Sequence, residues 1–293
     1  MFLSPLALLY YASFLLLAGL AVFVWAHRPR SRAARQFFLL ALSLLLWKLT
    51  LFLEVRVASL PAQLFLGRVN FAVVALAVYF ALNLVHAVAE KCPRASWVLL
   101  LETMLLTGVT LLTPLISTSE HVEKGVAITT YGPLFGVYLA HVMWYLITAL
   151  VVAFRGRSQT KNRAKRAQLL FIGVGLLATG GISTVTNALL PYHFLDFRFC
   201  DAGPISTVLF ASAVAYAVFV HQLFGLRVAL RVALVYGVLL SFVGGAYSSG
   251  IFVLSQYLTE SSGRGEQFLV LFLAFSFDPI RRFLEKKVDS LLF

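Results

Sequence analysis

The chain contains a succession of apolar runs, and most of them are long enough to cross a membrane. A helix rises about 1.5 Å per residue and the hydrocarbon core of a bilayer is about 30 Å thick, so roughly 20 apolar residues make one crossing. Eight runs approach that length: 5–26, 36–57, 64–89, 97–116, 133–154, 167–190, 204–226 and 232–258. A ninth, at 268–277, is shorter. These runs predict an all-α fold, a polytopic transmembrane helical bundle.

The composition excludes a soluble globule. Of the 293 residues, 60% are hydrophobic and 12% are charged, whereas soluble domains are about 45–50% apolar and about 25% charged. We therefore expect the lipid bilayer as the chain's surroundings. The net charge of +12 does not indicate a nucleic-acid partner, because it divides unequally between the two sides of a membrane.

One basic segment fixes the predicted sidedness. Residues 155–168 (RGRSQTKNRAKRAQ) separate two apolar runs and contain no acid. Short loops rich in Lys and Arg stay in the cytoplasm. With this loop inside, most of the 24 basic residues fall on cytoplasmic segments. The prediction is a multi-pass protein of the bacterial cytoplasmic (inner) membrane, with its N-terminus outside.

The ninth run is too short to be assigned by length alone. The turn before it, at 259–266, has two acids and one base, while Arg281, Arg282, Lys286 and Lys287 follow it. This asymmetry predicts a crossing, and an odd number of crossings places the C-terminus in the cytoplasm. We expect a seven-helix bundle at 1–231, followed at 232–293 by a transmembrane hairpin and a cytoplasmic helix.

The tail after the ninth run has the pattern of an amphipathic helix. Asp278 can cap its first turn, and Pro279 suits the first helical position. One apolar stripe then follows, formed by Ile280, Phe283, Leu284, Val288, Leu291 and Leu292. Such a stripe lies on the lipid surface or pairs with a copy of itself. We favour the second arrangement, a parallel homodimer.

Polar residues inside the predicted spans mark candidate sites, because ionisable groups at membrane depth are costly and turn toward the bundle interior or each other. The candidates for ligand binding, in the outer half of the bundle, are Arg68, Tyr79, His141, Tyr145 and Asn187. Further intramembrane polar residues are Lys48, Glu54, Asn83, His86 and Glu102.

Counting along the helices gives these residues approximate depths. His141, Tyr79 and Lys48 come out at middle depth. Arg68, Glu54 and Asn187 fall nearer the outer surface, and Glu102, Asn83 and His86 nearer the inner one. Purely structural interpretations stay open: Lys48 can extend to the interface, His141 can be a satisfied interior histidine, and Glu54 can pair with Arg68 across the helix hairpin.

Catalytic signatures are absent from the sequence. It contains no HExxH, GxSxG, P-loop or CxxC motif, and its histidines do not have the spacing of metal ligands. We expect no cofactor, no metal site and no enzymatic activity in this chain.

Several segments carry a resemblance to a known family. They are RQFFLLALSLLLW ending at Trp47, GRVNF with Arg68 and Phe71, GPLFGVYL at 132–139, KRAQLLFIGVG followed by Asn187 and Pro191, AYAVFVHQLFGLRVALRVALVY at 215–236, and FDPIRRFLEKKVDSLLF. Together they resemble the N-terminal seven-transmembrane sensor region of bacterial sensor histidine kinases. The resemblance covers nearly the whole chain, and its last two segments are the most specific.

The resemblance implies a receptor role in a two-component signal transduction system. In that family the closing helix continues into a dimerising helix with the phosphorylated histidine and then an ATP-binding domain. No histidine follows His221, and no Asn box or Gly-rich ATP lid occurs. We therefore expect either a stand-alone receptor or a kinase cut before its catalytic half, with a separate kinase or response regulator as its partner.

A carrier or channel-like protein for a small solute or ion is the alternative from another class. Lys48, Asn83, His86 and Glu102 would then form a polar path through the bundle. Carriers commonly have inverted repeats and broken helices in corresponding positions, and the sequence has neither. The sensor is the favoured function.

Overall fold

The computed structural model describes residues 5–27, 31–91, 96–123 and 126–219. All of them fall in one compact unit, Met1–Gly225. The expected eighth and ninth spans, the amphipathic tail and the proposed boundary at 231 lie outside the described residues.

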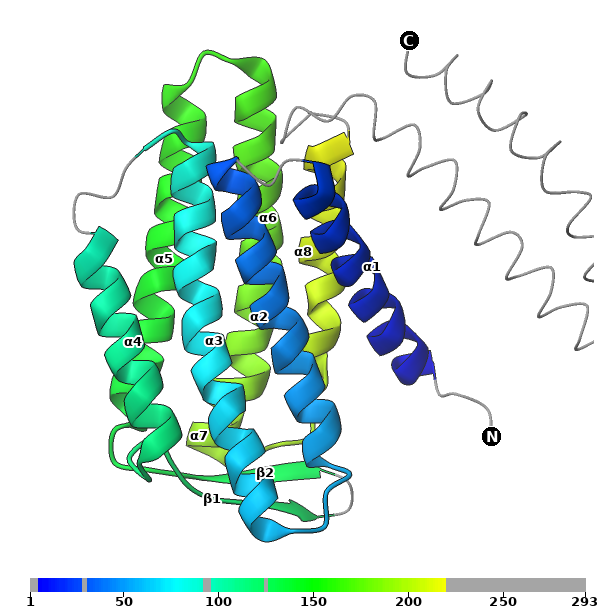
Figure 1. Cartoon of the computed structure of the whole chain (residues 1–293), viewed down its shortest axis with the longest axis vertical. Helices are drawn as coiled ribbons and strands as arrows, with labels where there is room; N and C mark the ends of the chain where they lie inside the picture. The colour runs from blue at the N-terminus through cyan, green and yellow to red at the C-terminus, as the bar shows by residue number, and fades with distance from the viewer. Residues whose placement is uncertain (1–4, 28–30, 92–95, 124–125, 220–293) are drawn as a thin grey trace, which may run out of the picture. The chain divides into compact units, whose positions relative to one another are not determined.

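The described residues are mostly helical, as predicted. Helices follow one another up and down the bundle in Figure 1. They are α1 (Pro5–His27), α2 (Arg32–Glu54), α3 (Leu60–Val88), α4 (Ser96–Leu112), α5 (Phe135–Gln159), α6 (Arg163–Thr184), α7 (Leu190–Phe194) and α8 (Ala202–Phe219). Four stretches are long and apolar enough to cross a membrane: α2, α3, α5, and α6 with its continuation to Phe194. Shorter apolar helices span Tyr10–Ala26, Trp97–Leu112 and Ala202–Val218.

Local sequence signals set several helix starts. The Ser31 side chain accepts a hydrogen bond from the backbone N–H of Ala34 at the start of α2. The Asn162 side chain does the same for Lys165 at the start of α6. Proline lies in the first turn of α3, where its missing N–H costs nothing.

A β-hairpin between α4 and α5 departs from the all-α prediction. Strands β1 (Ser117–Glu123) and β2 (Val126–Tyr131) pair antiparallel, with Glu120 opposite Thr129. The predicted run 97–116 ends as a helix at Leu112, shortly before Pro114. Thr and Val, which favour extended backbone, then occur in both strands, and β2 also contains Ile128. The all-α prediction was wrong for this connection.

The predicted helix 167–190 is also interrupted. A π-helical turn, η1 (Val185–Leu189), joins α6 to α7, and the N–H of Leu190 bonds to the carbonyl of Val185. Pro191 follows and has no N–H for a regular α-helical bond. The helix then ends at Phe194, and the next residue, Leu195, is left-handed with a φ of 53°. Helix α6 is therefore followed by a π-turn and a short helix that ends at a left-handed residue.

Helix α3 is the central element of the bundle. It contacts α2, α4, α5, α6 and β1. Its buried positions include the small residues Ala72, Ala75, Ala77 and Ala81, which let neighbouring backbones approach closely. Helices α6 and α8 form another close pair, with Gly175 packed against the backbone of Phe210.

Candidate functional site

The two ends of the bundle differ. We call the end that carries β1, β2 and α7 the hairpin end, and the end that carries the α5–α6 connection the loop end (Figure 1). At the loop end, Lys165 forms an ion pair with Glu90 at 2.6 Å, and Lys91 donates to Gln159 at 2.8 Å. The α3–α4 and α5–α6 connections therefore meet at the same end, as the predicted topology requires.

A cavity of about 220 Å³ lies toward the hairpin end. Its walls come from α2, α3, α5, α6, η1 and α8 together with both strands. Most of the lining is apolar, and three acids are part of it: the buried Glu54 and Glu120 and the exposed Asp201. Ligand sites in proteins are commonly concave, mostly apolar and provided with a few polar groups. This cavity is the candidate functional site.

Aromatic side chains form one wall of the cavity. Phe71, Tyr131, Phe135 and Tyr138 line it, and their contacting rings have centroids 4.1 to 6.4 Å apart. The Tyr138 hydroxyl donates to the backbone carbonyl of Phe71 at 2.9 Å. Because these residues come from α3, β2 and α5, the wall holds the hairpin against the helices. Trp47 of α2 also lines the cavity.

Glu120 is held in place from within the hairpin. Its side chain accepts hydrogen bonds from the hydroxyls of Ser117 at 2.9 Å and Thr129 at 2.8 Å. It is only 3% exposed, and burial raises the pKa of its carboxyl to about 7. Gly67 of α3 faces it: a Cβ there would lie 2.6 Å from Cγ of Glu120. The carboxyl reaches the cavity because α3 has no side chain at this position.

Glu54, at the end of α2, is 2% exposed and also lines the cavity. Among the described residues it has neither a hydrogen-bond partner nor an ion-pair partner. The sequence allowed a pair with Arg68, and the structure contradicts this. Arg68 instead donates from Nη2 to the carbonyl of Ser117 at 3.4 Å. The hairpin, which the sequence prediction lacked, supplies that acceptor.

Asn187 lies in the π-turn and joins it to the segment before α8. Its Nδ2 donates to the carbonyl of Cys200 at 2.8 Å, and its Oδ1 accepts from the Thr186 hydroxyl at 2.8 Å. A Cβ on Gly203 would lie 2.0 Å from Oδ1, so only glycine fits at this point in the first turn of α8. Burial raises the pKa of the neighbouring Cys200 thiol to about 12. Asn187 and Cys200 both line the cavity.

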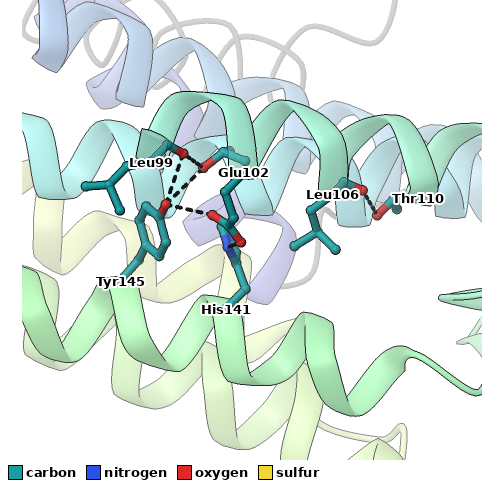
Figure 2. A network of polar contacts seen from close by, with 7 residues as sticks. Leu99, Glu102, Leu106, Thr110, His141 and Tyr145 are labelled. Carbon is teal, nitrogen blue, oxygen red and sulfur yellow. Dashed lines mark hydrogen bonds and ion pairs between the residues drawn. The ribbon is translucent and has the colours of Figure 1, made fainter. Parts of the chain in front are cut away.

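A second polar cluster lies between α4 and α5, and Figure 2 shows its side chains pointing toward one another. His141 Nδ1 is 2.7 Å from Glu102 Oε1, and the Tyr145 hydroxyl donates to Glu102 Oε2 at 2.7 Å. The same hydroxyl is 3.0 Å from the carbonyl of Leu99. We call Glu102, His141 and Tyr145 the α4–α5 cluster.

This cluster corrects the predicted depths. Residue counting predicted His141 at middle depth and Glu102 nearer the inner surface, yet the two side chains are in direct contact. Counting failed because α5 continues through the basic segment to Gln159, so that its end is not level with the start of α4 in Figure 1.

The structure separates the predicted ligand residues. Of the five, Asn187 lines the cavity. His141 and Tyr145 belong to the α4–α5 cluster, and the ring of Tyr79 is 6.4 Å from that of Tyr145. Arg68 is half-buried beside β1, with its Nε buried and without a partner among the described residues. The sequence prediction missed Glu120. The available signal was the Thr and Val residues around it, which favour a β-strand.

The remaining intramembrane polar residues do not form a continuous path. Lys48 is fully buried, where it donates to the Ser13 hydroxyl and lies 4.8 Å from the ring centroid of Tyr10. Asn83 donates to the carbonyl of Tyr79 in its own helix at 2.9 Å. Nδ1 of His86 is buried without a partner among the described residues. Within the described part of the chain, no hydrogen bond connects these residues to one another, so the carrier alternative gains no support.

Comparison with known proteins places the chain in context. Residues 9–227 match the model of a family described as the N-terminal 7TM region of histidine kinase. The match spans α1 almost from its start to a point beyond α8 and includes every cavity-lining residue. No curated protein matches the chain.

Proposed function

This chain belongs to the family of N-terminal seven-transmembrane regions of histidine kinases, and from that premise we propose that it is a signal receptor whose input site is the cavity at the hairpin end. Its membership makes it a transmembrane sensor region for signal transduction. The observation that carries the further step is the cavity itself, which brings together the hairpin, the central helix α3 and the π-turn that leads to α8.

The proposed topology has α1 to α6 and α8 each crossing the bacterial inner membrane, with the hairpin end outside. The basic residues of the α5–α6 connection support this orientation. We also propose that the sensor bundle ends at 231 and that residues 232–293 form the output hairpin and helix of a homodimer. A separate or further domain would provide the kinase activity. Alkaline phosphatase inserted at residue 124 should be active, and the same enzyme fused after residue 159 should be inactive.

A ligand in the cavity would have a direct route to α8. Asn187 contacts the cavity and bonds to Cys200, just before α8. Further along, Thr179 of α6 donates to the carbonyl of Ser206 in α8 at 2.7 Å. A displacement of the π-turn would therefore move the first turns of α8 relative to α6. Helix α8 leads toward the output segment of the chain.

Filling the cavity provides the test. The full chain would be joined after Phe293 to the dimerisation and ATP-binding domains of a well-behaved histidine kinase and reconstituted in vesicles. Gly67→Leu places a side chain where Glu120 now lies, and we expect it to change the autophosphorylation rate at least threefold. Gly108→Leu is the matched control, because a Cβ at Gly108 meets nothing within 4 Å. Equal rates for both variants and the unsubstituted chain would contradict the proposed input site.

A further inference from the structure

We infer that the cavity at the hairpin end binds a small organic cation, a protonated amine carried on an aromatic or aliphatic body. The inference rests on the proposed function, in which this cavity is the input site, and it adds the chemical class of the ligand. Three observations carry it: an unpartnered buried acid, a second acid on the same cavity, and an apolar, largely aromatic wall.

The unpartnered acid is the strongest observation. Glu54 is 2% exposed and lines the cavity without a hydrogen-bond or ion-pair partner among the described residues. A buried polar group without a partner costs free energy, and a buried charge costs considerably more. The fold tolerates this cost next to an open volume into which a ligand donor fits. A partner that donates hydrogen bonds would remove the cost.

The second acid makes that partner a cation. Glu120 lines the same cavity, and the electrostatic effect of Glu120 reaches Glu54. Two carboxylates on one site oppose each other's ionisation, and a positive charge near both removes this repulsion. An ammonium group has three donors and a unit charge. It can therefore serve Glu54 while Glu120 keeps its bonds from Ser117 and Thr129.

The basic residues near the cavity form no ion pair with Glu54 or Glu120 among the described contacts. Arg198, the basic residue among those lining it, binds both carboxylate oxygens of Asp196, at 2.9 and 2.7 Å. Arg68 reaches the carbonyl of Ser117 and forms no ion pair with Glu120 among the described contacts. Asp201, exposed, adds a further acid to the lining. An anionic ligand would therefore lie beside three acids, Glu54, Glu120 and Asp201, and would oppose their ionisation.

The wall and the volume favour an organic body over a bare metal ion. Calcium takes 6–8 oxygen ligands, whereas no group of three or more His, Cys, Asp or Glu suited to a metal occurs in the described part of the chain. The aromatic wall offers ring faces to a cation and apolar contact to its body. The volume of about 220 Å³ is below the roughly 300–1,000 Å³ of pockets for drug-sized ligands. The ligand is accordingly small.

Three probes with the same body and different head groups test the inference. They are phenethylamine, 2-phenylethanol and phenylacetate, titrated by calorimetry into the full chain in phosphatidylcholine nanodiscs, with empty nanodiscs to correct for partitioning. We expect phenethylamine to bind at least tenfold more tightly than the alcohol, and phenylacetate to bind most weakly. Equal affinity for the three probes, or tighter binding of phenylacetate, would overturn the inference.

Variants tie the binding to the two acids. Glu54→Gln should weaken phenethylamine binding at least tenfold and bring its affinity close to that of the alcohol, and Glu120→Gln should weaken it less. Glu102→Gln is the matched control, because Glu102 is an acid outside the cavity. If Glu54→Gln leaves the preference for the amine unchanged, the inference fails. A response of the kinase fusion to Gly67→Leu with no amine preference would reject the cation and retain the input site.

Discussion

The cavity at the hairpin end and the α4–α5 cluster both place glutamate beside aromatic rings, yet their acids have opposite surroundings. In the cluster, Oε1 of Glu102 meets His141 and Oε2 meets Tyr145, both at 2.7 Å. The Glu102 side chain nevertheless remains 47% exposed. In the cavity, Glu54 is almost completely buried and has no such partner among the described residues.

The difference separates a structural role from a binding role. Both carboxylate oxygens of Glu102 have protein partners, and these hydrogen bonds join α4 to α5, although Nε2 of His141 is buried without a partner among the described residues. A buried acid without a partner adds no stability to the protein alone. It gains a favourable interaction only when a ligand arrives. Glutamate thus joins two helices in the α4–α5 cluster and serves as a ligand-binding group in the cavity.

Replacing the histidine of the α4–α5 cluster should have the largest effect. His141→Ala removes a ring whose side chain is 2% exposed and deprives Glu102 of one partner. Cavity formation and the lost hydrogen bond together should destabilise the protein by about 2–4 kcal/mol. The measurement is thermal unfolding in detergent. Ile147→Ala, on the exposed face of α5, should shift the melting temperature far less, and equal shifts would show that the cluster is not structural.

The pH dependence of stability should trace to the cavity. The pKa of Glu120 is about 7 in the folded chain and 4.5 in its ordinary state, so the folded chain holds this proton more tightly than the unfolded one. The resulting stabilisation is complete below pH 4.5 and is lost as the pH rises through about 7. It amounts to about 3 kcal/mol at most.

Melting temperatures measured between pH 5 and 8 would check this sign. Glu120→Gln should reduce the slope of the curve over that window, whereas Glu123→Gln, an acid at the end of the same strand, should leave the slope unchanged. A slope in Glu120→Gln equal to that of the unsubstituted chain would contradict the assignment to Glu120.

The order and approximate bounds of the helices could be predicted because apolar length and charge asymmetry are properties of contiguous segments. The predicted spans began at 36 and 167, whereas the Ser31 and Asn162 caps start α2 at Arg32 and α6 at Arg163, because capping and not apolar length sets a helix start. The family could also be identified from the sequence, and the match over residues 9–227 confirms it. The seven crossings, their orientation and the output helix are still predictions.

The site was harder to predict because its residues are brought together by irregular connections. The cavity depends on a hairpin that brings Glu120 to α3 and on a π-turn that aims Asn187 toward Cys200. Helical periodicity correctly placed His141 and Tyr145 on one face of the helix, and both are buried. It could not tell that this face meets Glu102 rather than the cavity. The spacing of residues along a helix identifies its buried face but does not determine which neighbouring element packs against that face.

Amide substitutions of the two acids should give smaller effects of different sign. Glu102→Gln replaces one acceptor oxygen by an NH₂ group, so that either His141 or Tyr145 loses its partner, and we expect a loss of about 1–2 kcal/mol. Glu54→Gln removes a buried carboxylate without a partner and should leave the stability of the ligand-free chain unchanged or raise it by about 1 kcal/mol. Thermal unfolding at pH 8 compares the two directly. A larger loss for Glu54→Gln than for Glu102→Gln would reverse the assignment of roles.

The smallest effect should come from the exposed ion pair beside the cavity. Arg198 and Asp196 form a bidentate pair, and the Arg198 guanidinium holds the pKa of Asp196 at about 2. The Arg198 side chain is 81% exposed, and exposed ion pairs contribute little to stability. Arg198→Ala should therefore leave the melting temperature unchanged.

Arg198→Ala also removes a positive charge near the cavity, so phenethylamine should bind slightly more tightly, by at most about threefold. This gain should vanish in high salt because exposed charges are screened. Arg198→Lys keeps the charge and should behave like the unsubstituted chain. A tenfold loss of amine binding in Arg198→Ala would mean that Arg198 positions the ligand, and the negative charge of Glu54 and Glu120 would no longer account for recognition.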